Sequence, residues 1–457
     1  MRSLKLWCVG NLLLATLMLA GCTQPTPKPE PQAAPAKPQA HAAVDAKMSA
    51  VPEPTATSET AAQSEAKLAV QAVPAGTLPA DHWLVGTSTA EDMVPAVVAE
   101  SAPRALLAES GPAYLEKVGL TRVLHLKGTP YEMGVQQGTM LKEEIKEGVA
   151  LLKLVGNMSL KEKYALTLRE AWQRTSPFIP EKYKEEIRGL SESTGIALED
   201  VQDFTIFPEL FHCSGFAFWG KATADGALLH GRVLDYMRDA GMDKFALIII
   251  HEPAQGNATV NIAYSGMLGS VTGMNAEHVS IGEMGGRGEG KWDGMPMSIL
   301  LREALETCST LDAAKDFFTK TPRTCQYYYV IADSKANNGI GAAVGVAAEP
   351  DSIQFVEPNQ SVPQLPRPVE DAVLLSANER YDCLVDRVQK QYGKITPQIA
   401  LDVMARGVSM KSNMHDVLFK PATLEFWVAN STIDAPACNL PYTHHDLNVL
   451  MKDKPQK

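Results

Sequence analysis

The spacing of apolar residues changes along the chain, and each spacing predicts one kind of element. An apolar residue at every third or fourth position is typical of a helix with one buried face, and alternation is typical of a strand. Helices are predicted at 131–154, 160–172, 181–190, 297–308, 311–320, 381–391 and 398–406, with a helical or irregular apolar run at 200–211. Strands are predicted at 121–127, 214–219, 227–232, 245–251, 259–265, 278–283, 327–332, 341–347, 352–356, 373–377, 416–419 and 424–429.

The order of these elements predicts the fold class. After residue 213 the chain reads as many strands, two helices, many strands, two helices and two final strands. That order suits two sheets stacked face to face with helices outside them, which is a four-layer α+β sandwich, αββα. The segment 113–212 is mainly helical, so we expect a helical N-terminal segment followed by a core at 213–457.

The first residues predict export. Two basic residues precede an apolar run at 12–20, and Leu-Ala-Gly-Cys follows at 19–22. This arrangement is typical of a signal peptide, and the run is short for a membrane span. The ending resembles a bacterial lipobox, which implies a signal at 1–22 and lipidation of Cys22; Thr23 after it favours the outer membrane. A simple cleaved signal is the alternative.

Residues 23–112 are expected to form a tether and a transition. The part at 23–78 is rich in Pro, Ala, Gln, Ser and Thr and has no aromatic residue, so it lacks the apolar surface that would offset the entropy of ordering. The part at 79–112 is expected to be a transition with one short helix. The expected protein is therefore a globular body that faces the periplasm and is held at a membrane by lipid.

Charge and cysteine usage exclude some classes of function. A net charge of −11 and a pI near 5.5 argue against a nucleic-acid surface, which needs a basic footprint. No Cys-x-x-Cys pair or tight Cys/His cluster indicates zinc, and His444-His445-Asp446 is interpreted as a polar tail rather than a metal site. We expect neither a metal nor a cofactor.

Five cysteines follow the predicted signal, at 213, 308, 325, 383 and 438. An odd number leaves at least one thiol unpaired within the chain. If that thiol is Cys213, two disulfides could use the other four, and their spacing does not fix the pairing.

Chemically active residue types gather around the predicted hairpin of 214–219 and 227–232. Cys213 precedes its first strand, and Arg232 and Asp235 lie at the end of its second strand. A hairpin brings its ends together, so these side chains form a candidate nucleophile with charged partners. The plainer alternative is a small buried cysteine and a surface ion pair.

The stretch at 213–236, C-S-G-F-A-F-W-G-K-A-T-A-D-G-A-L-L-H-G-R-V-L-D-Y, resembles the N-terminal-nucleophile hydrolases. The resemblance is to their acyl-CoA:6-aminopenicillanate acyltransferase-like branch, peptidase C45, whose core choloylglycine hydrolases share. The family pattern is a Cys, a hairpin with Asp-Gly, and then G-R-N-x-D. Further matching motifs are Y-E-M-G-x-Q-x-G at 131–138, S-G at 265–266, T-G-M-N at 272–275 and P-A-T-L-E-F-W-V-A at 421–429. The resemblance implies the same αββα fold.

The resemblance also implies roles for individual residues. Cys213 would become a chain terminus by autoproteolysis of the bond that precedes it, and its α-amine would then act as the base that activates the thiol. Asp235 would orient that amine, and Arg232 would lower the pKa of the thiol. Asn378 would donate to the oxyanion, and Arg380 would add positive charge. In this sequence Val233 stands where the family pattern has Asn.

The implied reaction passes through a thioester on Cys213. The substrate would be a small acyl amide, acyl thioester or ester, and water or an amine would resolve the thioester. Cleavage of a linear amide or transfer of the acyl group is the leading interpretation. Two alternatives stay open: an ester hydrolase resembling phospholipase B, and an inactive binding lipoprotein with the same fold.

Overall fold

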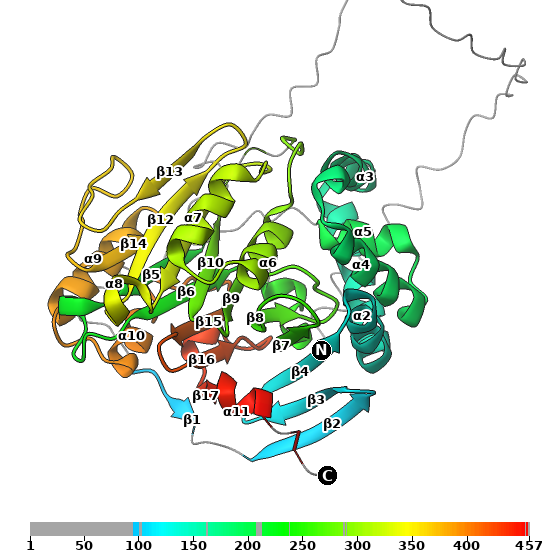
Figure 1. Cartoon of the computed structure of the whole chain (residues 1–457), viewed down its shortest axis with the longest axis horizontal. Coiled ribbons are helices and arrows are strands. Elements are labelled where there is room, and N and C mark those ends of the chain that lie inside the picture. Colours follow the sequence, from blue (N-terminus) through cyan, green and yellow to red (C-terminus); the bar gives the residue numbers. More distant parts are fainter. Residues whose placement is uncertain are drawn as a thin grey trace, which may run out of the picture. The chain divides into compact units, whose positions relative to one another are not determined.

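The computed structural model describes residues 95–99, 103–160, 163–206, 213–236, 238–286, 288, 290–452 and 454–455. The predicted signal and nearly all of the predicted tether lie outside this part of the chain. Within it, the strands form two sheets (Figure 1). The seven-stranded sheet has the order β1 (Val98–Ala99), β17 (Tyr442–Asp446), β16 (Glu425–Asn430), β15 (Asn413–Lys420), β6 (Leu229–Asp235), β5 (Ser214–Phe218) and β14 (Ala372–Leu375). The ten-stranded sheet has the order β13 (Ile353–Val356), β12 (Ala342–Ala348), β11 (Tyr327–Asp333), β10 (Val279–Gly285), β9 (Thr272–Asn275), β8 (Thr259–Tyr264), β7 (Ala246–Pro253), β4 (Thr121–Gly128), β3 (Ala113–Val118) and β2 (Arg104–Ser110).

The two sheets pack face to face through apolar side chains. Phe419 and Phe426 of the seven-stranded sheet share one buried cluster with Ile248 and Ile250 of the ten-stranded sheet. A second inter-sheet cluster contains Cys213 together with residues of β10 and β11. These contacts form the central interface of a sandwich, since apolar faces of two sheets are buried against each other.

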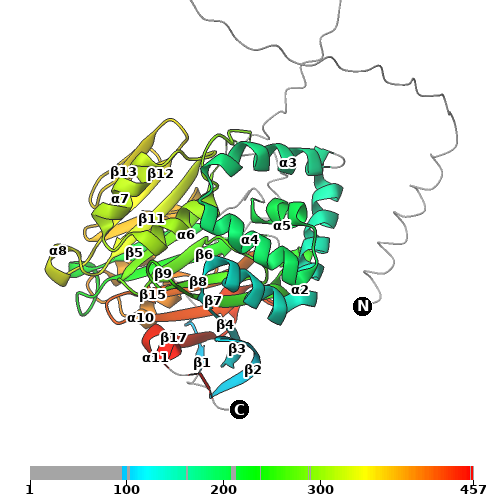
Figure 2. The same ribbon diagram turned by 45° about the vertical axis from the view of Figure 1, so that its right-hand side comes forward.

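Helices cover the outer face of each sheet (Figures 1 and 2). Apolar clusters join the ten-stranded sheet to α6 (Met297–Thr307) and α7 (Leu311–Lys320) at one end, and to α2 (Pro130–Leu160), α4 (Glu181–Thr194) and α5 (Leu198–Thr205) at the other. The seven-stranded sheet packs on α9 (Glu379–Gln391) and α10 (Pro397–Val403). The remaining helices are α3 (Lys163–Thr175), α8 (Ala336–Gly339) and α11 (Leu447–Lys452). The four-layer αββα sandwich predicted from the element order is confirmed.

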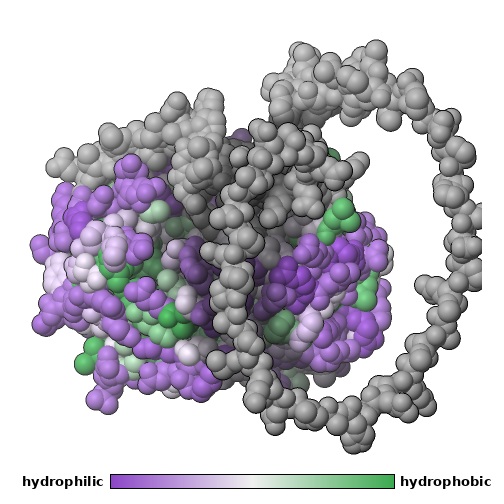
Figure 3. Space-filling model, turned by 90° about the horizontal axis from the view of Figure 1, so that it is seen from above, coloured by the Kyte–Doolittle hydropathy of each residue, from purple (hydrophilic) through white to green (hydrophobic). Residues whose placement is uncertain are grey.

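Polar residues cover most of the described surface in the view of Figure 3, with apolar residues between them. Most large apolar side chains are instead buried between the four layers. Among the described residues, no helix is both long and apolar enough to cross a membrane.

Five segments that were not predicted as strands are strands: β1, β2, β3, β9 and β17. The predicted transition is wrong at 104–110, which forms the half-exposed edge strand β2. The connection after β8 contains the four-residue strand β9. The predicted polar tail is wrong too, because it forms β17, in which His445 is buried and lies 3.0 Å from the Thr121 hydroxyl.

In the part of the chain that the structure describes, the two disulfides that the four cysteines other than Cys213 could form are not present. Within the described residues, Cys308 and Cys438 are free thiols. Cys308 belongs to the cluster outside the ten-stranded sheet, whereas Cys383 belongs to the cluster outside the seven-stranded sheet. Both sheets therefore separate those two cysteines.

The chain before Cys213 is part of the same sandwich. The segment at 113–212 is mainly helical as expected, but it begins with β3 and β4. Strand β4 pairs in parallel with β7, with Val123 opposite Ile248. One sheet therefore contains strands from both sides of Cys213.

Helices α2 and α4 approach so closely that glycine is required at their contact. A Cβ atom on Gly134 would lie 2.1 Å from the Glu186 carbonyl oxygen, and one on Gly189 would lie 2.3 Å from that of Tyr131. Because backbone atoms block both positions, Gly134→Ala should force the helices apart and destabilise the protein by about 1–3 kcal/mol or more. The shift of the urea unfolding midpoint measures this loss.

Gly148→Ala provides a control in the same helix. The nearest atoms to a Cβ there belong to the Phe245 ring, at 3.9 Å, so alanine fits. Alanine is favoured over glycine inside a helix by about 0.5–1 kcal/mol, so this variant should be as stable as the wild type or more stable. Equal midpoints for the two variants would show that the close approach is not what requires Gly134.

Candidate active site

The hairpin of β5 and β6 places Arg232 against Cys213. Ser214 pairs with Val233 and Phe216 pairs with Gly231, so the residue before β5 lies beside the end of β6. Arg232 Nη2 donates to Cys213 Sγ at 3.4 Å, and both side chains are buried. The predicted meeting of the thiol and the guanidinium is therefore present, and Arg232 is not part of a surface ion pair.

The Arg232 guanidinium connects the two sheets. Its Nε donates to the Glu283 carbonyl oxygen at 3.0 Å, and its Nη2 lies 3.3 Å from the Glu283 carboxylate on β10. Its Nη1 lies 3.0 Å from His415 Nε2 on β15. A Cβ atom on Gly282 would lie 2.9 Å from Arg232 Cγ, so this glycine leaves room for the side chain. Glu283 and His415 thus join the site without having been predicted from the sequence.

Burial controls the ionisation of these groups. It raises the pKa of Cys213 to about 12, although the charge of Arg232 acts in the opposite direction. Arg232 therefore lowers the thiol pKa as expected, but burial raises it by more, so the net shift is upward. Burial also raises the pKa of Glu283 and, helped by the charge of Arg232, holds that of His415 well below its usual range. The thiol of the continuous chain is therefore protonated at neutral pH.

Asp235, at the end of β6, makes two strong contacts. Its Oδ2 accepts from Arg380 Nη2 at 2.5 Å, and its Oδ1 accepts from the Met410 backbone N–H at 2.9 Å. The same Arg380 nitrogen donates to the Ser214 hydroxyl at 2.6 Å, and that hydroxyl lies 2.7 Å from the hydroxyl of Ser376. Burial raises the pKa of the Asp235 carboxyl, and Arg380 opposes that rise. Arg380 is thus a direct partner of Asp235, beside the residue that follows Cys213.

Asn378 lies near the start of β5, and its side chain is exposed to solvent. It follows β14, which pairs with β5 through Leu375 opposite Gly215. Asn378 is exposed, and among the described residues its side chain has no hydrogen-bond partner. Its φ of 53° and ψ of −137° are strained for a residue other than glycine, and such strain is often found at functional sites.

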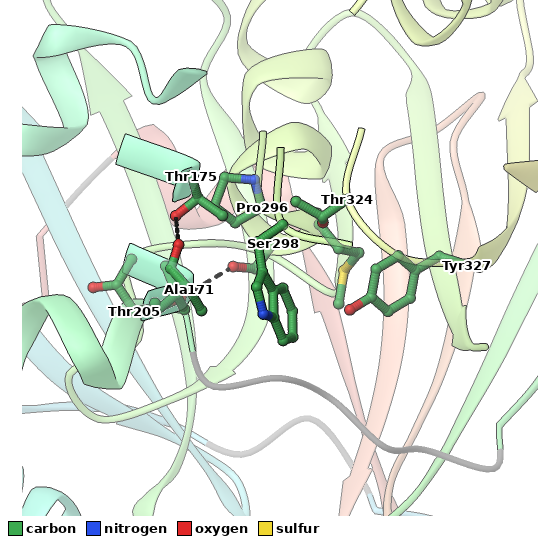
Figure 4. Close-up of a pocket in the computed structure, with 10 residues that line it drawn as sticks. Ala171, Thr175, Thr205, Pro296, Ser298, Thr324 and Tyr327 are labelled. Carbon is green, nitrogen blue, oxygen red and sulfur yellow. Dashed lines mark hydrogen bonds between the residues drawn. The ribbon is translucent and has the colours of Figure 1, made fainter. Parts of the chain in front are cut away.

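A pocket lies at the end of α5 (Figure 4). Its empty volume is about 340 Å³, and it is lined by Ala171, Thr175, Thr205, Ile206, Trp292, Pro296, Met297, Ser298, Thr324 and Tyr327. The hydroxyls of Thr175 and Ser298 already donate to backbone carbonyls. Cys213 is seven positions after Ile206 along the chain, a distance of at most roughly 25 Å when fully extended. Residues 207–212, which include the expected cleavage point, lie outside the described residues.

Metal chemistry has no candidate site in the part of the chain that the structure describes. The described residues contain no group of three or more His, Cys, Asp and Glu side chains that could hold a metal ion. His444 instead bonds to Glu425 at 3.0 Å and stacks on Trp427.

Comparison with known proteins supports the resemblance. Residues 224–362 match the family model of acyl-coenzyme A:6-aminopenicillanic acid acyl-transferase. This match includes Arg232, Asp235 and Glu283; Cys213 precedes it and Asn378 follows it. The predicted resemblance to this branch of the N-terminal-nucleophile hydrolases is confirmed.

Several curated sequences and solved structures are similar to this chain over part of their length. Protein dcd1B of Dictyostelium discoideum is 25% identical over 356 residues, which cover 69% of this chain and 70% of dcd1B. Acid ceramidase of Rattus norvegicus is 28% identical over 191 residues, which cover 35% of this chain and 47% of the ceramidase, so the match spans about half of that enzyme. The solved structure of the Caenorhabditis elegans N-acylethanolamine-hydrolyzing acid amidase ortholog is 16% identical with a TM-score of 0.38, over 46% of this chain and 93% of that one.

Proposed function

We propose that the protein is an amidohydrolase or acyltransferase of the N-terminal-nucleophile type with Cys213 as its nucleophile. The observation that carries this proposal is the buried contact between Arg232 Nη2 and Cys213 Sγ, at 3.4 Å. A buried arginine beside a thiol favours the thiolate, which is the reactive form. The family match and the similarity to an acid ceramidase support an acyl amide as the substrate class.

Maturation is the first proposed step. Cleavage of the peptide bond between residues 212 and 213 frees the α-amine of Cys213. An unperturbed α-amine has a pKa of roughly 7.7–8 and accepts a proton near neutrality. The amine is held near Asp235, whose carboxylate lies at the end of the adjacent strand. Arg380 fixes that carboxylate through its 2.5 Å contact.

The proposed reaction follows from these groups. The α-amine takes the thiol proton, and Cys213 Sγ attacks the acyl carbon. The oxyanion receives a hydrogen bond from Asn378 after its side chain turns towards the substrate. The C–N bond breaks as the leaving amine takes a proton from the α-ammonium group, and a thioester remains on Cys213. Water or a second amine then attacks the thioester and releases the acyl group.

Wild-type protein and Cys213→Ala test this proposal directly. The wild type is expected to show two fragments divided before Cys213 in an intact-mass measurement, and to release amine from an acyl amide. Cys213→Ala is expected to remain one chain and to release none. Cys308→Ala, which alters a free thiol in a different cluster, should behave as the wild type.

Each other outcome supports a different conclusion. Division of Cys213→Ala at the same bond would contradict autoproteolysis by this thiol. Equal behaviour of wild type and Cys213→Ala towards acyl amides, acyl-CoA and phospholipids would contradict catalysis and support a binding protein. Turnover of phospholipid alone would support the ester hydrolase.

We also propose that Cys22 is lipidated and anchors the protein at the outer membrane, facing the periplasm. The Leu-Ala-Gly-Cys sequence at 19–22 supports this. Labelled palmitate should enter the wild type and not Cys22→Ala, and fractionation of the membranes gives the location. Equal labelling of both proteins would contradict the anchor.

A further inference from the structure

We propose that His415 is a positioning residue that holds the Arg232 guanidinium in place against Cys213. The proposal rests on the proposed function only in taking Cys213 as the nucleophile. His415 lies on β15, which is the neighbour of β6 in the seven-stranded sheet. Its side chain is fully buried, and its Nε2 lies 3.0 Å from Arg232 Nη1.

The hydrogen bonds around His415 fix its tautomer. A guanidinium nitrogen can only donate, so His415 Nε2 must be the acceptor and the ring proton must be on Nδ1. Nδ1 lies 3.3 Å from the hydroxyl of Tyr264, which can accept that proton's hydrogen bond. The Thr272 hydroxyl also lies near this atom, 3.2 Å from Nε2. His415 is therefore a neutral acceptor directed at Arg232, and its low pKa agrees with that state.

A β-bulge places His415 in this position. The register of β15 against β6 shifts between Asn413, which is opposite Asp235, and His415, which is opposite Leu234. A bulge changes the direction in which the following side chains point, and bulges are frequent beside active sites. The Asn413 side chain stabilises this one by donating to the Leu234 and His415 carbonyl oxygens at 3.2 and 3.3 Å.

These contacts define the orientation of the guanidinium. Its Nε is held by the Glu283 carbonyl oxygen and its Nη1 by His415, so Nη2 is the nitrogen directed at Cys213 Sγ. The Glu283 carboxylate competes for Nη2 at 3.3 Å, and its second oxygen, Oε1, is buried and has no hydrogen-bond partner among the described residues. If His415 could not accept, the guanidinium would be free to turn towards this carboxylate and to weaken its contact with the thiol.

The test compares His415→Leu, which removes the acceptor, with His415→Gln, whose side-chain oxygen retains one. The first readout is the rate at which iodoacetamide alkylates Cys213 as a function of pH, followed by mass spectrometry. His415→Leu should shift this profile to higher pH and reduce kcat about tenfold on an acyl amide, with KM changed less than about twofold. His415→Gln should have an alkylation profile and a kcat close to those of the wild type. Urea midpoints show whether each variant is folded.

Tyr264→Phe is the replacement test variant if His415→Leu does not fold. It removes the hydroxyl that faces Nδ1 and should shift the alkylation profile in the same direction by a smaller amount. Unchanged profiles in both folded variants, or a His415→Gln protein no better than His415→Leu, would overturn the positioning role. Failure of the wild type to turn over any acyl amide would contradict the proposed function alone, because the alkylation profile does not depend on turnover.

Discussion

Arg232→Met is expected to reduce turnover by about 10²–10³-fold and to destabilise the protein by about 3–5 kcal/mol. The Arg232 and Glu283 side chains are both fully buried and lie 3.3 Å apart. Methionine fills a similar volume but leaves the Glu283 carboxylate buried without its cation, and that is the source of the loss in stability. It also removes the charge beside Cys213, and removal of one group that stabilises charge in an active site reduces kcat by about 10²–10³-fold. Urea unfolding and acyl-amide hydrolysis measure the two effects.

A double variant separates catalysis from stability. Adding Glu283→Gln to Arg232→Met removes the unpaired carboxylate, so most of the lost stability should return while turnover stays as low as in Arg232→Met. Recovery of turnover in the double variant would mean that Arg232 serves only to neutralise Glu283. A single Arg232→Met variant as stable as the wild type would contradict the buried ion pair itself.

Arg302→Met is expected to have a comparable effect on stability at a different place, also about 3–5 kcal/mol. Arg302, on α6, is fully buried and pairs with Glu186 of α4 at 2.9 Å and with Glu306 at 2.8 Å. Its loss leaves both carboxylates without their main partner. Because α4 precedes Cys213 and α6 follows it, the N-terminal fragment of the cleaved protein should also separate on size-exclusion chromatography.

Arg174→Met is the matched control for this second prediction. Arg174 of α3 also contacts a residue that follows Cys213 in the chain. Its Nη2 and Nε donate to the Asp293 carboxylate at 2.6 and 2.9 Å, but this pair is exposed to solvent. Exposed pairs contribute about 0–1 kcal/mol, so the variant should remain close to the wild type. If Arg174→Met is destabilised as much as Arg302→Met, burial is not what makes the α4–α6 contact strong.

The sequence predicted the elements whose pattern is set by burial within a single segment. Strand β4 and helix α7 were found because their apolar positions repeat regularly, and Thr310 caps α7 by accepting from the Ala313 N–H. Strand β2 was missed because it is an edge strand with alternating half-exposed positions. Strand β17 was missed because its two histidines look like surface residues until Thr121 and Glu425 are placed beside them.

The same distinction applies to the candidate site. Cys213, Arg232 and Asp235 were predicted together because one hairpin joins them, and pairing within a hairpin follows from local sequence. Glu283 and His415 come from strands that reach the site only when the two sheets pack and a bulge forms. No local pattern in the sequence predicts the packing or the bulge. The rise in the thiol pKa was missed for a related reason, because it depends on how deeply Cys213 is buried.

The parallel pairing of β4 with β7 determines the order of folding and the proposed cleavage. The two strands are far apart in sequence, and contacts of this kind form slowly because a long loop must close first. In the intact chain that closure is intramolecular, whereas after cleavage the same pairing joins two molecules and depends on their concentration. Folding must then precede maturation, and a mature enzyme that has been denatured in dilute solution would regain its activity only slowly. Its lifetime would be governed by its rate of unfolding rather than by an equilibrium.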